Sequence, residues 1–301
     1  MKKKYIYLSI MGGIGDQIFQ YSYASFLKKK FYCNVYLDIS YYKSILNHNR
    51  FKFRLENLAK KNNYIITKDF ANINYKYLSY LRLINVLGIN KIFPYIYKFF
   101  FKSYIKNFIY EFWSKNKKVK NDINSYYYGY WHDLVYIKNL KKNISRNLIN
   151  HHNNKSKLKK FIKNKIDNNT VAIHVRGGDF HYLPSHNILD KKYYNNSIKF
   201  FVKLLKKPKF HIFTNDIPLA KKLLNYYLKD CYFIFIKRYN FSDIEEFCLF
   251  SKYKYSIIAN STFGLLSTYL SYTRKMSFAP KIWLLGKKLE KKKRFSKLKF
   301  I

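Results

Sequence analysis

Short apolar runs, rich in β-branched and aromatic residues, alternate with helical patterns throughout the second half of this 301-residue chain. The predicted strands are 170–175, 210–214, 231–236, 255–259 and 275–279. The predicted helices between them are 191–206, one opened by Pro218, one that follows the capping box "SDIE" at 242–245, and one from about Phe263. Because parallel strands need such crossover helices, the alternation predicts an α/β fold with a mainly parallel sheet and helices on both faces.

The first half begins with the same kind of unit. An apolar strand at 4–10 runs into a glycine turn, after which Phe19, Tyr23, Phe26 and Leu27 follow helical spacing. Further along, the sequence predicts a strand at 33–40, a helical aromatic region at 75–115, and a strand or loop at 126–134.

The polar stretch "ISRNLINHHNNKSKLKK" at 144–160 is the best candidate for a domain boundary. A chain of this length is long enough for two domains of about 150 residues each. We therefore predict two Rossmann-like domains with mainly parallel sheets, at 1–155 and 156–301.

Polar residues and a pair of glycines end or follow three of the predicted strands in the second half. They are His174, Arg176, Gly177, Gly178 and Asp179 at the first, Asn215 and Asp216 at the second, and Asn260, Ser261 and Thr262 at the third. In open α/β sheets, ligands bind beyond the carboxyl ends of the strands. These residues therefore predict one ligand site at that edge of the sheet.

The chemistry of these residues suits an anionic ligand such as a phosphate. Arg176 offers a planar fork for phosphate oxygens, and the two glycines after it allow the backbone to approach a ligand closely. Ser261 and Thr262 precede a predicted helix, whose first N–H groups favour anions. Simpler roles stay open: a surface ion pair for Arg176, a helix N-cap for Ser261 or Thr262, and a buried structural role for His174.

A second glycine turn, "MGGIGDQ" at 11–17, lies near the start of the chain. Together with Gly177 and Gly178 it accounts for five of the nine glycines. The turn is not a Walker loop, because no Gly-Lys-Ser or Gly-Lys-Thr follows it, and as a dinucleotide-binding fingerprint it is incomplete.

The chain is strongly basic, with 59 Lys and Arg against 16 Asp and Glu and a formal net charge of +43. Such a charge attracts anionic partners: nucleic acids, membrane surfaces or phosphorylated ligands. An A/T-rich codon bias is the alternative source, since Lys, Asn, Ile, Tyr and Phe are all abundant. The basic residues are scattered through every predicted helix rather than gathered in a stripe, so we expect no nucleic-acid binding.

The charge also favours peripheral contact with an anionic membrane. The stretch 93–113 and the basic tail 284–299 mix apolar side chains with lysines, as interfacial helices do. The alternatives are a partly buried helix for the first segment and a solvated end for the second. No run of about 18 apolar residues lacks charge, so we expect no transmembrane helix. Cys33, Cys231 and Cys248 form no CxxC pair, which argues against a zinc site or a disulfide scaffold and fits a cytoplasmic protein.

Taken together, these motifs resemble those of bacterial α-1,2-fucosyltransferases of glycosyltransferase family 11. "GGIGDQIFQYSYA" (12–24) is similar to the GGxGNQxFQYA opening of that family, and "HVRGGDF" (174–180) resembles its HxRRxD motif. "FTND" (213–216) and "IIANSTF" (257–263) resemble its FSDD-like and IxANSSF elements. Shorter patches that fall where similar ones occur are "LDIS" (37–40), "HN" (48–49) and "GYW" (129–131). The resemblance spans nearly the whole chain in the right order.

The resemblance implies a GT-B-like fold, with the acceptor bound to the first domain and the GDP-sugar donor to the second. It implies metal-independent, inverting transfer of L-fucose from GDP-β-L-fucose, without a cofactor, to the 2-hydroxyl of a galactose-like acceptor in a surface glycan. Arg176 matches the first arginine of HxRRxD, which implies a catalytic role in holding the leaving diphosphate. Donor-binding roles are implied for His174, Asp179, Asn215, Asp216, Asn260, Ser261, Thr262, Phe263, Gly13, Gly15 and Gln17.

Some positions depart from the family pattern. Gly177 stands in place of the second motif arginine, Asp16 in place of the usual asparagine, and Leu265 and Leu266 where aromatic residues often follow the asparagine segment. These departures leave two alternatives open: a transferase of the same fold that uses another GDP-sugar, and a non-catalytic sugar-nucleotide binder. The sequence identifies no general base.

Overall fold

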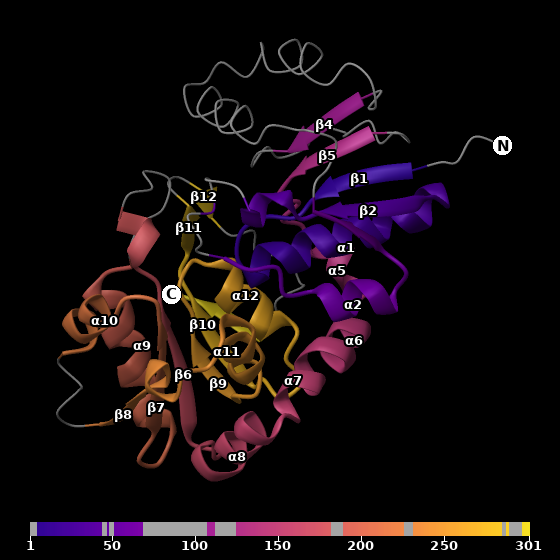
Figure 1. The fold of residues 1–301 in the computed structure, drawn as a ribbon. Coiled ribbons are helices and arrows are strands. Elements are labelled where there is room, and N and C mark those ends of the chain that lie inside the picture. The colour runs from indigo at the N-terminus through magenta and orange to yellow at the C-terminus, as the bar shows by residue number, and fades with distance from the viewer. Residues whose placement is uncertain are drawn as a thin grey trace. The chain divides into compact units, whose positions relative to one another are not determined.

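The computed structural model describes residues 5–43, 47, 51–68, 107–111, 125–181, 189–225, 231–284, 287–288 and 297–301. The chain forms two compact units, Met1–Lys142 and Asn143–Ile301, which can be followed by colour along the sequence in Figure 1. The division falls ahead of the predicted limit at residue 155. The acceptor and donor roles of the two domains stay predictions.

The first unit contains a five-stranded parallel sheet in the order β3-β2-β1-β5-β4. Its strands are β1 (Tyr5–Ser9), β2 (Asn34–Asp38), β3 (Ile65–Thr67), β4 (Asn107–Glu111) and β5 (Ser125–Gly129). The helices described in this unit are α1 (Ile14–Phe31), α2 (Glu56–Lys61), α5 (Leu134–Lys138) and the start of α6 (Lys141–Ile144), with a 3₁₀ turn at Ser40–Lys43. Ile6 and Leu8 of β1 are completely buried, as expected for a central parallel strand.

The second unit contains a six-stranded parallel sheet in the order β13-β10-β9-β6-β7-β8. Its strands are β6 (Thr170–Val175), β7 (Lys209–Thr214), β8 (Tyr232–Phe235), β9 (Tyr255–Ile257), β10 (Met276–Ala279) and β13 (Leu298–Phe300). Its helices include a π-helix at Ser145–Asn150, α7 (His151–Asn153), α8 (Ser156–Lys165), α9 (Lys191–Leu204), α10 (Ile217–Leu224), α11 (Asp243–Phe250) and α12 (Thr262–Tyr269). A short antiparallel pair joins β11 (Ile282–Leu284) to β12 (Lys287–Lys288). The prediction of two Rossmann-like units with mainly parallel sheets, as in a GT-B-like fold, is confirmed.

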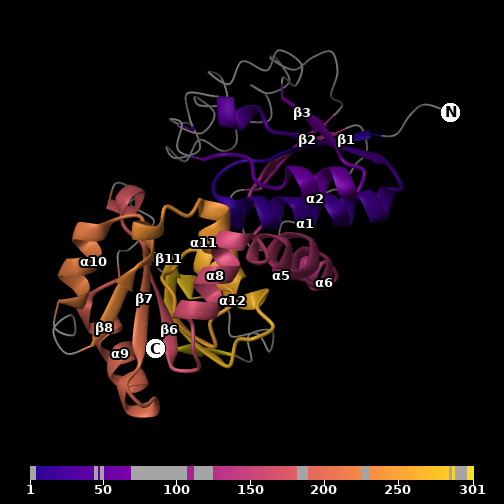
Figure 2. The ribbon, with the colours of Figure 1, turned by 60° about the horizontal axis from the view of Figure 1, so that its bottom comes forward.

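Alternate residues of β6 face opposite sides of this sheet, because side chains along a strand repeat with a period of two. Val171 and Ile173 lie in the core shared with α9 and α10. His174 faces the other side, where the ring of Phe250 from α11 lies 6.3 Å away. Figures 1 and 2 show α9 and α10 on one side of β6 and β7, and α11 and α12 on the other. Because helices cover both faces of the sheet, the polar residues gather at the ends of the strands.

Two predictions about individual elements are wrong. Within the stretch predicted as helical, Asn107–Glu111 is the strand β4, whose backbone pairs in parallel with β5 along its whole length. At the end of the basic tail, Leu298–Phe300 forms β13, which pairs in parallel with β10. These three residues are therefore part of the sheet, and not a solvated end or an interfacial helix.

The segments for which we predict membrane contact lie mostly outside the described residues, at 93–106, 112–113, 285–286 and 289–296. Across the ranges that the structure does describe, no helix is both long enough and apolar enough to cross a bilayer. Peripheral membrane contact therefore stays a prediction.

Candidate active site

The carboxyl ends of β9, β6 and β7 lie next to one another, because these strands are neighbours in the parallel sheet of the second unit. The ring of His174, at the end of β6, lies 4.9 Å from the ring of Phe263 in the first turn of α12. Gly177, just after β6, contacts Asn215, just after β7. The polar residues predicted after these three strands are thus brought together at one edge.

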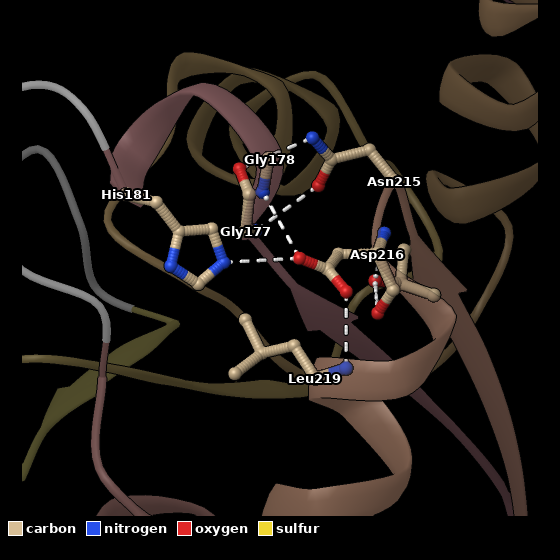
Figure 3. Close-up of polar contacts among 7 residues, drawn as sticks. Gly177, Gly178, His181, Asn215, Asp216 and Leu219 are labelled. Carbon is tan, nitrogen blue, oxygen red and sulfur yellow. Dashed lines mark hydrogen bonds and ion pairs between the residues drawn. The ribbon is translucent and has the colours of Figure 1, made fainter.

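Asn215 and Asp216 hold the loop that follows β6 (Figure 3). Asn215 accepts a hydrogen bond from the N–H of Gly177 through Oδ1 at 3.1 Å, and donates through Nδ2 to the carbonyl of the same glycine at 3.2 Å. Asp216 Oδ2 accepts from the N–H of Gly178 at 3.2 Å and lies 3.1 Å from His181 Nε2. These two side chains therefore fix the backbone next to Arg176, while their predicted contact with the donor stays a prediction.

The two glycines of this loop have different reasons to be glycine. A Cβ at position 177 would lie 2.5 Å from Asp216 Oδ2 and 2.6 Å from Leu219 Cδ2, well inside van der Waals contact. Gly178 has a φ of +61°, in the left-handed region that costs a residue with a side chain about 1–2 kcal/mol. Asp216 and Leu219 thus occupy the space that a second arginine would need for its Cβ.

Asp216 is also the N-cap of α10, where its Oδ1 accepts from the N–H of Leu219 at 3.0 Å. This bond is the largest effect on the carboxyl group, and together with the bonds from His181 and Gly178 it lowers the pKa of Asp216 below its usual 3.8. Partial burial acts in the opposite direction and is outweighed. The carboxylate is therefore ionised at neutral pH and engaged by the loop and the helix.

His174 is a neutral group at the centre of this edge. It is 5% exposed, and burial, followed by repulsion from Arg176, lowers its pKa to about 3. Its Nδ1 makes no hydrogen bond to any of the described residues, and a Cβ at position 264 would come within 3.1 Å of that atom. Gly264 therefore leaves room beside the imidazole, and the predicted donor contact of His174 is untested.

Arg176 is half-buried, and its guanidinium carbon lies 5.1 Å from the centre of the Phe180 ring. This is a cation–π distance, and a guanidinium stacked on a ring bonds planar acceptors through its edge. Asp179 lies in the 3₁₀ turn Gly178–His181, and its side chain is outside the described part of the structure. The roles predicted for Asp179, in donor binding and in orienting Arg176, stay predictions.

Helix α12 begins at the same edge. Ser261 is its N-cap and accepts from the N–H of Phe263 at 3.4 Å, which is the simpler of the two roles considered for this serine. Thr262 is the first helical residue, and buried Asn260 donates to the carbonyl of Trp283 at 3.0 Å. The first N–H groups of α12 and its dipole favour an anion at this position.

In the first unit, the glycine turn leads into α1. Gly12 has a φ of +77°, and a Cβ there would lie 2.7 Å from Asp16 Oδ2. Gly13 is the N-cap of α1, and Gly15 is buried in the first helical turn. Position 12 therefore requires glycine for its backbone conformation and for the space that Asp16 occupies. The donor contacts predicted for Gly13 and Gly15 are untested.

Gln17 is completely buried in the same helix. Its Nε2 donates to the carbonyls of Gly12 and Lys52, at 3.2 and 2.8 Å, and its Oε1 accepts from the N–H of Arg54 at 2.9 Å. The amide thus ties the glycine turn to the segment that follows Lys52. This is a structural use of Gln17, and the predicted donor contact stays a prediction.

A polar pair that we did not predict from the sequence lies beside this turn: His132 Nε2 is 2.9 Å from Asp16 Oδ1. Asp16 follows β1 and His132 follows β5, and these strands are neighbours in the parallel sheet. The two side chains are 20% and 18% exposed, respectively. Each residue lies shortly after a strand, which was a usable signal, but the pairing joins positions 116 residues apart.

In the described ranges of the chain, no group of three His, Cys, Asp or Glu side chains is arranged to hold a metal ion. Asp216 offers one carboxylate near Arg176, and a Mg²⁺–diphosphate site usually uses more protein or phosphate oxygens. Independence from metal therefore stays a prediction.

Comparisons with known proteins agree with the resemblance. The family model described as "Glycosyl transferase family 11" matches residues 5–299. An "Alpha-1,2-colitosyltransferase" of Escherichia coli is 27% identical over 91% of this chain and 90% of its own length. The "O-antigen biosynthesis glycosyltransferase WbnK" of Escherichia coli is 27% identical over 93% of this chain and 95% of its own.

Solved structures of fucosyltransferases are also similar, at low identity. The fucosyltransferase NodZ from Bradyrhizobium matches with a TM-score of 0.48 and 12% identity, over 90% of this chain and 93% of its own. POFUT1 in complex with GDP-fucose matches with a TM-score of 0.44 and 12% identity, over 92% of this chain and 98% of its own. Because the family model covers nearly the whole sequence, this chain belongs to glycosyltransferase family 11.

Proposed function

We propose that the protein is an inverting α-1,2-glycosyltransferase that moves L-fucose from GDP-β-L-fucose to the 2-hydroxyl of a galactose-like sugar. Membership of family 11 supports the reaction class, and the name of one relative carries the 1,2 linkage. An α-linked product made from a β-linked donor requires inversion at the anomeric carbon. A second relative is named for O-antigen biosynthesis, which supports a surface glycan or its lipid-linked precursor as the acceptor.

The observation that carries this proposal is the loop that bears Arg176. Asn215 and Asp216 fix the backbone directly after Arg176, and the guanidinium rests against Phe180. When GDP leaves, negative charge develops on its diphosphate oxygens, and donors that are already in place stabilise this charge without reorganisation. In the proposed mechanism these donors are the Arg176 guanidinium and the first N–H groups of α12.

One observation favours a second donor: a relative at 27% identity is a colitosyltransferase. Colitose lacks the 3-hydroxyl of fucose, so the same diphosphate contacts serve both GDP-sugars. A site that hydrogen-bonds the 3-hydroxyl rejects the deoxy sugar strongly, whereas an apolar site discriminates weakly between the two. The choice between these donors therefore depends on contacts to one hydroxyl.

A donor panel tests the proposal. The protein is mixed with a galactoside acceptor and GDP-fucose, GDP-colitose, GDP-mannose or a UDP-sugar, and nucleotide release and product linkage are measured. We expect turnover with GDP-fucose and an α-1,2-linked product. Faster turnover of GDP-colitose would identify GDP-colitose, and not GDP-fucose, as the preferred donor. Thermal stabilisation by GDP-fucose without turnover would indicate a non-catalytic binder.

Removal of divalent metal ions is expected to leave the activity unchanged. In this mechanism a guanidinium and backbone N–H groups stabilise the leaving diphosphate, which is the task a metal performs in other enzymes. The measurement is kcat with and without EDTA. Activity that disappears in EDTA and returns on titration with Mn²⁺ or Mg²⁺ would contradict the mechanism.

A further inference from the structure

The two central strands of the second sheet, β6 and β9, stop pairing before the carboxyl edge. Their register ends at Ile173 and Ile257. β7 and β8 lie on one side of β6, and β9, β10 and β13 lie on the other. Open α/β sheets bind ligands beyond the carboxyl ends of the strands, at the point where the strand order reverses. In this sheet that point lies between β6 and β9.

Two adjacent tyrosines of α9, here called the tyrosine pair, bind the first carbonyl beyond this pairing on each strand. Tyr194 donates from its hydroxyl to the carbonyl of His174 in β6, at 3.1 Å. Tyr193 donates to the carbonyl of Ile258, the residue directly after β9, at 2.8 Å. The Tyr193 hydroxyl oxygen also lies 3.2 Å from the carbonyl oxygen of Phe278 in β10. One turn of α9 therefore binds the backbone at the ends of three neighbouring strands.

The tyrosine pair is itself held firmly. Asp190, the N-cap of α9, accepts from the N–H of Tyr193 at 2.8 Å. The two phenol rings meet edge to face, with their centroids 5.1 Å apart, and Ile198 and Phe201 fix the rest of the helix in the core. Burial raises the pKa of both phenols above its usual 10. Both hydroxyls therefore keep their protons and act as donors.

The residues that follow the two bound carbonyls carry the proposed donors to the diphosphate. Arg176 comes two residues after His174, and Thr262, the first residue of α12, comes four residues after Ile258. Donors stabilise developing charge without reorganisation only if the backbone already holds them in place. A displacement of about 1 Å can cost about 10²-fold in rate. The backbone at the start of both segments is held by the tyrosine pair.

We propose that the tyrosine pair positions the groups that stabilise the leaving diphosphate. Tyr194 sets the path of the chain that carries Arg176, and Tyr193 sets the start of α12. Both hydroxyls act through the backbone, so these tyrosines are positioning residues and not catalytic ones. The inference rests on the proposed function for the place of the diphosphate, and it extends the site to α9.

The alternative is that the two hydroxyls only stabilise the fold. A buried hydroxyl bonded to a protein acceptor adds to stability wherever it lies, so a lower unfolding temperature does not distinguish the two roles. Tyr253 provides a matched control, because it is buried and its hydroxyl lies 2.7 Å from Nδ1 of His211. Tyr253 precedes β9, and His211 is near the start of β7. This bond therefore lies toward the amino edge of the sheet, away from the proposed diphosphate site.

The first experiment compares Tyr193→Phe, Tyr194→Phe and Tyr253→Phe in the full chain, each of which removes one hydroxyl and keeps the ring. We measure kcat and acceptor KM well below the unfolding temperature, at saturating concentration of the GDP-sugar that wild type uses fastest. In the first two variants kcat should fall about 10-fold with little change in acceptor KM, because misplaced donors stabilise the leaving diphosphate less. Tyr253→Phe should lose similar thermal stability and keep wild-type kcat.

A double-mutant cycle then tests whether Tyr194 acts through Arg176. In the Arg176→Ala background, Tyr194→Phe should change kcat by less than about twofold, because the group that it positions is gone. A hydroxyl that only stabilises the fold has the same effect in both backgrounds. The same cycle on the Kd of GDP, measured by calorimetry, needs no sugar transfer. There, Tyr194→Phe should weaken GDP binding about threefold or more when Arg176 is present, and hardly at all when it is absent.

The inference is overturned if Tyr193→Phe and Tyr194→Phe both keep kcat within about twofold of wild type. It is also overturned if Tyr194→Phe lowers kcat by the same factor in both backgrounds. If wild type transfers no sugar from any donor of the panel, the proposed function fails and the GDP cycle alone decides the inference. An effect on GDP binding that depends on Arg176 then supports it, and an effect that is absent or equal in both backgrounds overturns it. A protein that binds no GDP overturns both.

Discussion

At the scale of single residues, the proposed catalytic role falls on Arg176, whose guanidinium carbon lies 5.1 Å from the centre of the Phe180 ring. We expect Arg176→Ala to lower kcat by about 10²–10³-fold, which corresponds to losing one transition-state donor worth roughly 3–4 kcal/mol. Arg176→Lys should recover little, because an ammonium cannot copy a bidentate fork. Turnover with GDP-fucose is the measurement, with thermal unfolding as the control for folding. A folded Arg176→Ala protein with near-wild-type turnover would remove the role assigned here.

Gly177 gives a prediction about stability. Gly177→Ala places a Cβ against Asp216 and Leu219, so we expect the free energy of unfolding to fall by about 1–3 kcal/mol, as in other overpacked sites. Gly177→Arg, which restores the motif residue, should cost at least as much. Denaturant unfolding measures both, and Gly13→Ala is the control, since the nearest atom to its Cβ is on Phe51 at 3.4 Å. If Gly177→Arg unfolds with the same free energy as wild type, the loop can adopt another backbone conformation that accommodates the arginine side chain.

At this scale the sequence predicts positions better than contacts. Asn215 and Asp216 were found because they follow a strand, and they do lie beside the Arg176 loop. Their bonds to Gly177 and Gly178 join residues 38 positions apart, and depend on the path of a loop that has no sequence signature. The Asp16–His132 pair was missed for the same reason.

At the scale of elements, the regular alternation in the second half was predicted well, because each strand and helix there has a local signal. The capping box is an example: Ser242 and Glu245 make both of its hydrogen bonds at the start of α11. β4 was missed because a mixture of aromatic and lysine residues suits a strand or a helix equally. Its state is determined by pairing with β5, which is a tertiary effect.

The start of α10 gives a prediction about pH. Asp216→Ala removes the N-cap and should lower the free energy of unfolding by about 1–2 kcal/mol, whereas Asp216→Asn can keep the cap. Since folding lowers the pKa of Asp216 below 3.8, its carboxylate stabilises the native state fully above that value, and the stabilisation is lost as pH falls through the lower folded pKa. The difference in unfolding free energy between wild type and Asp216→Ala should therefore shrink in acid. A difference that grows in acid would mean that folding raises the pKa of Asp216 instead of lowering it.

At the scale of the whole molecule, a formal charge of +43 predicts attraction to anionic surfaces in addition to any GDP-sugar. We expect the protein to sediment with vesicles that contain anionic lipid and to be released by salt, because salt screens the attraction. Sedimentation at low and high salt is the measurement, with neutral vesicles as the control. Equal binding to neutral vesicles would mean that apolar contact, and not charge, is responsible.

Both main sheets are parallel, and this determines the order in which the chain can fold as it is synthesised. Ile6 and Leu8 of β1 lie opposite Ser125 and Tyr127 of β5, so the first sheet cannot be completed until more than a third of the chain has left the ribosome. In the second unit, β6 cannot complete its pairing until β9 has been synthesised, because Ile173 of β6 pairs with Ile257 of β9. Pairings this distant make folding slow and leave apolar strands exposed meanwhile, so recovery of active protein should depend on chaperones and on the rate of translation.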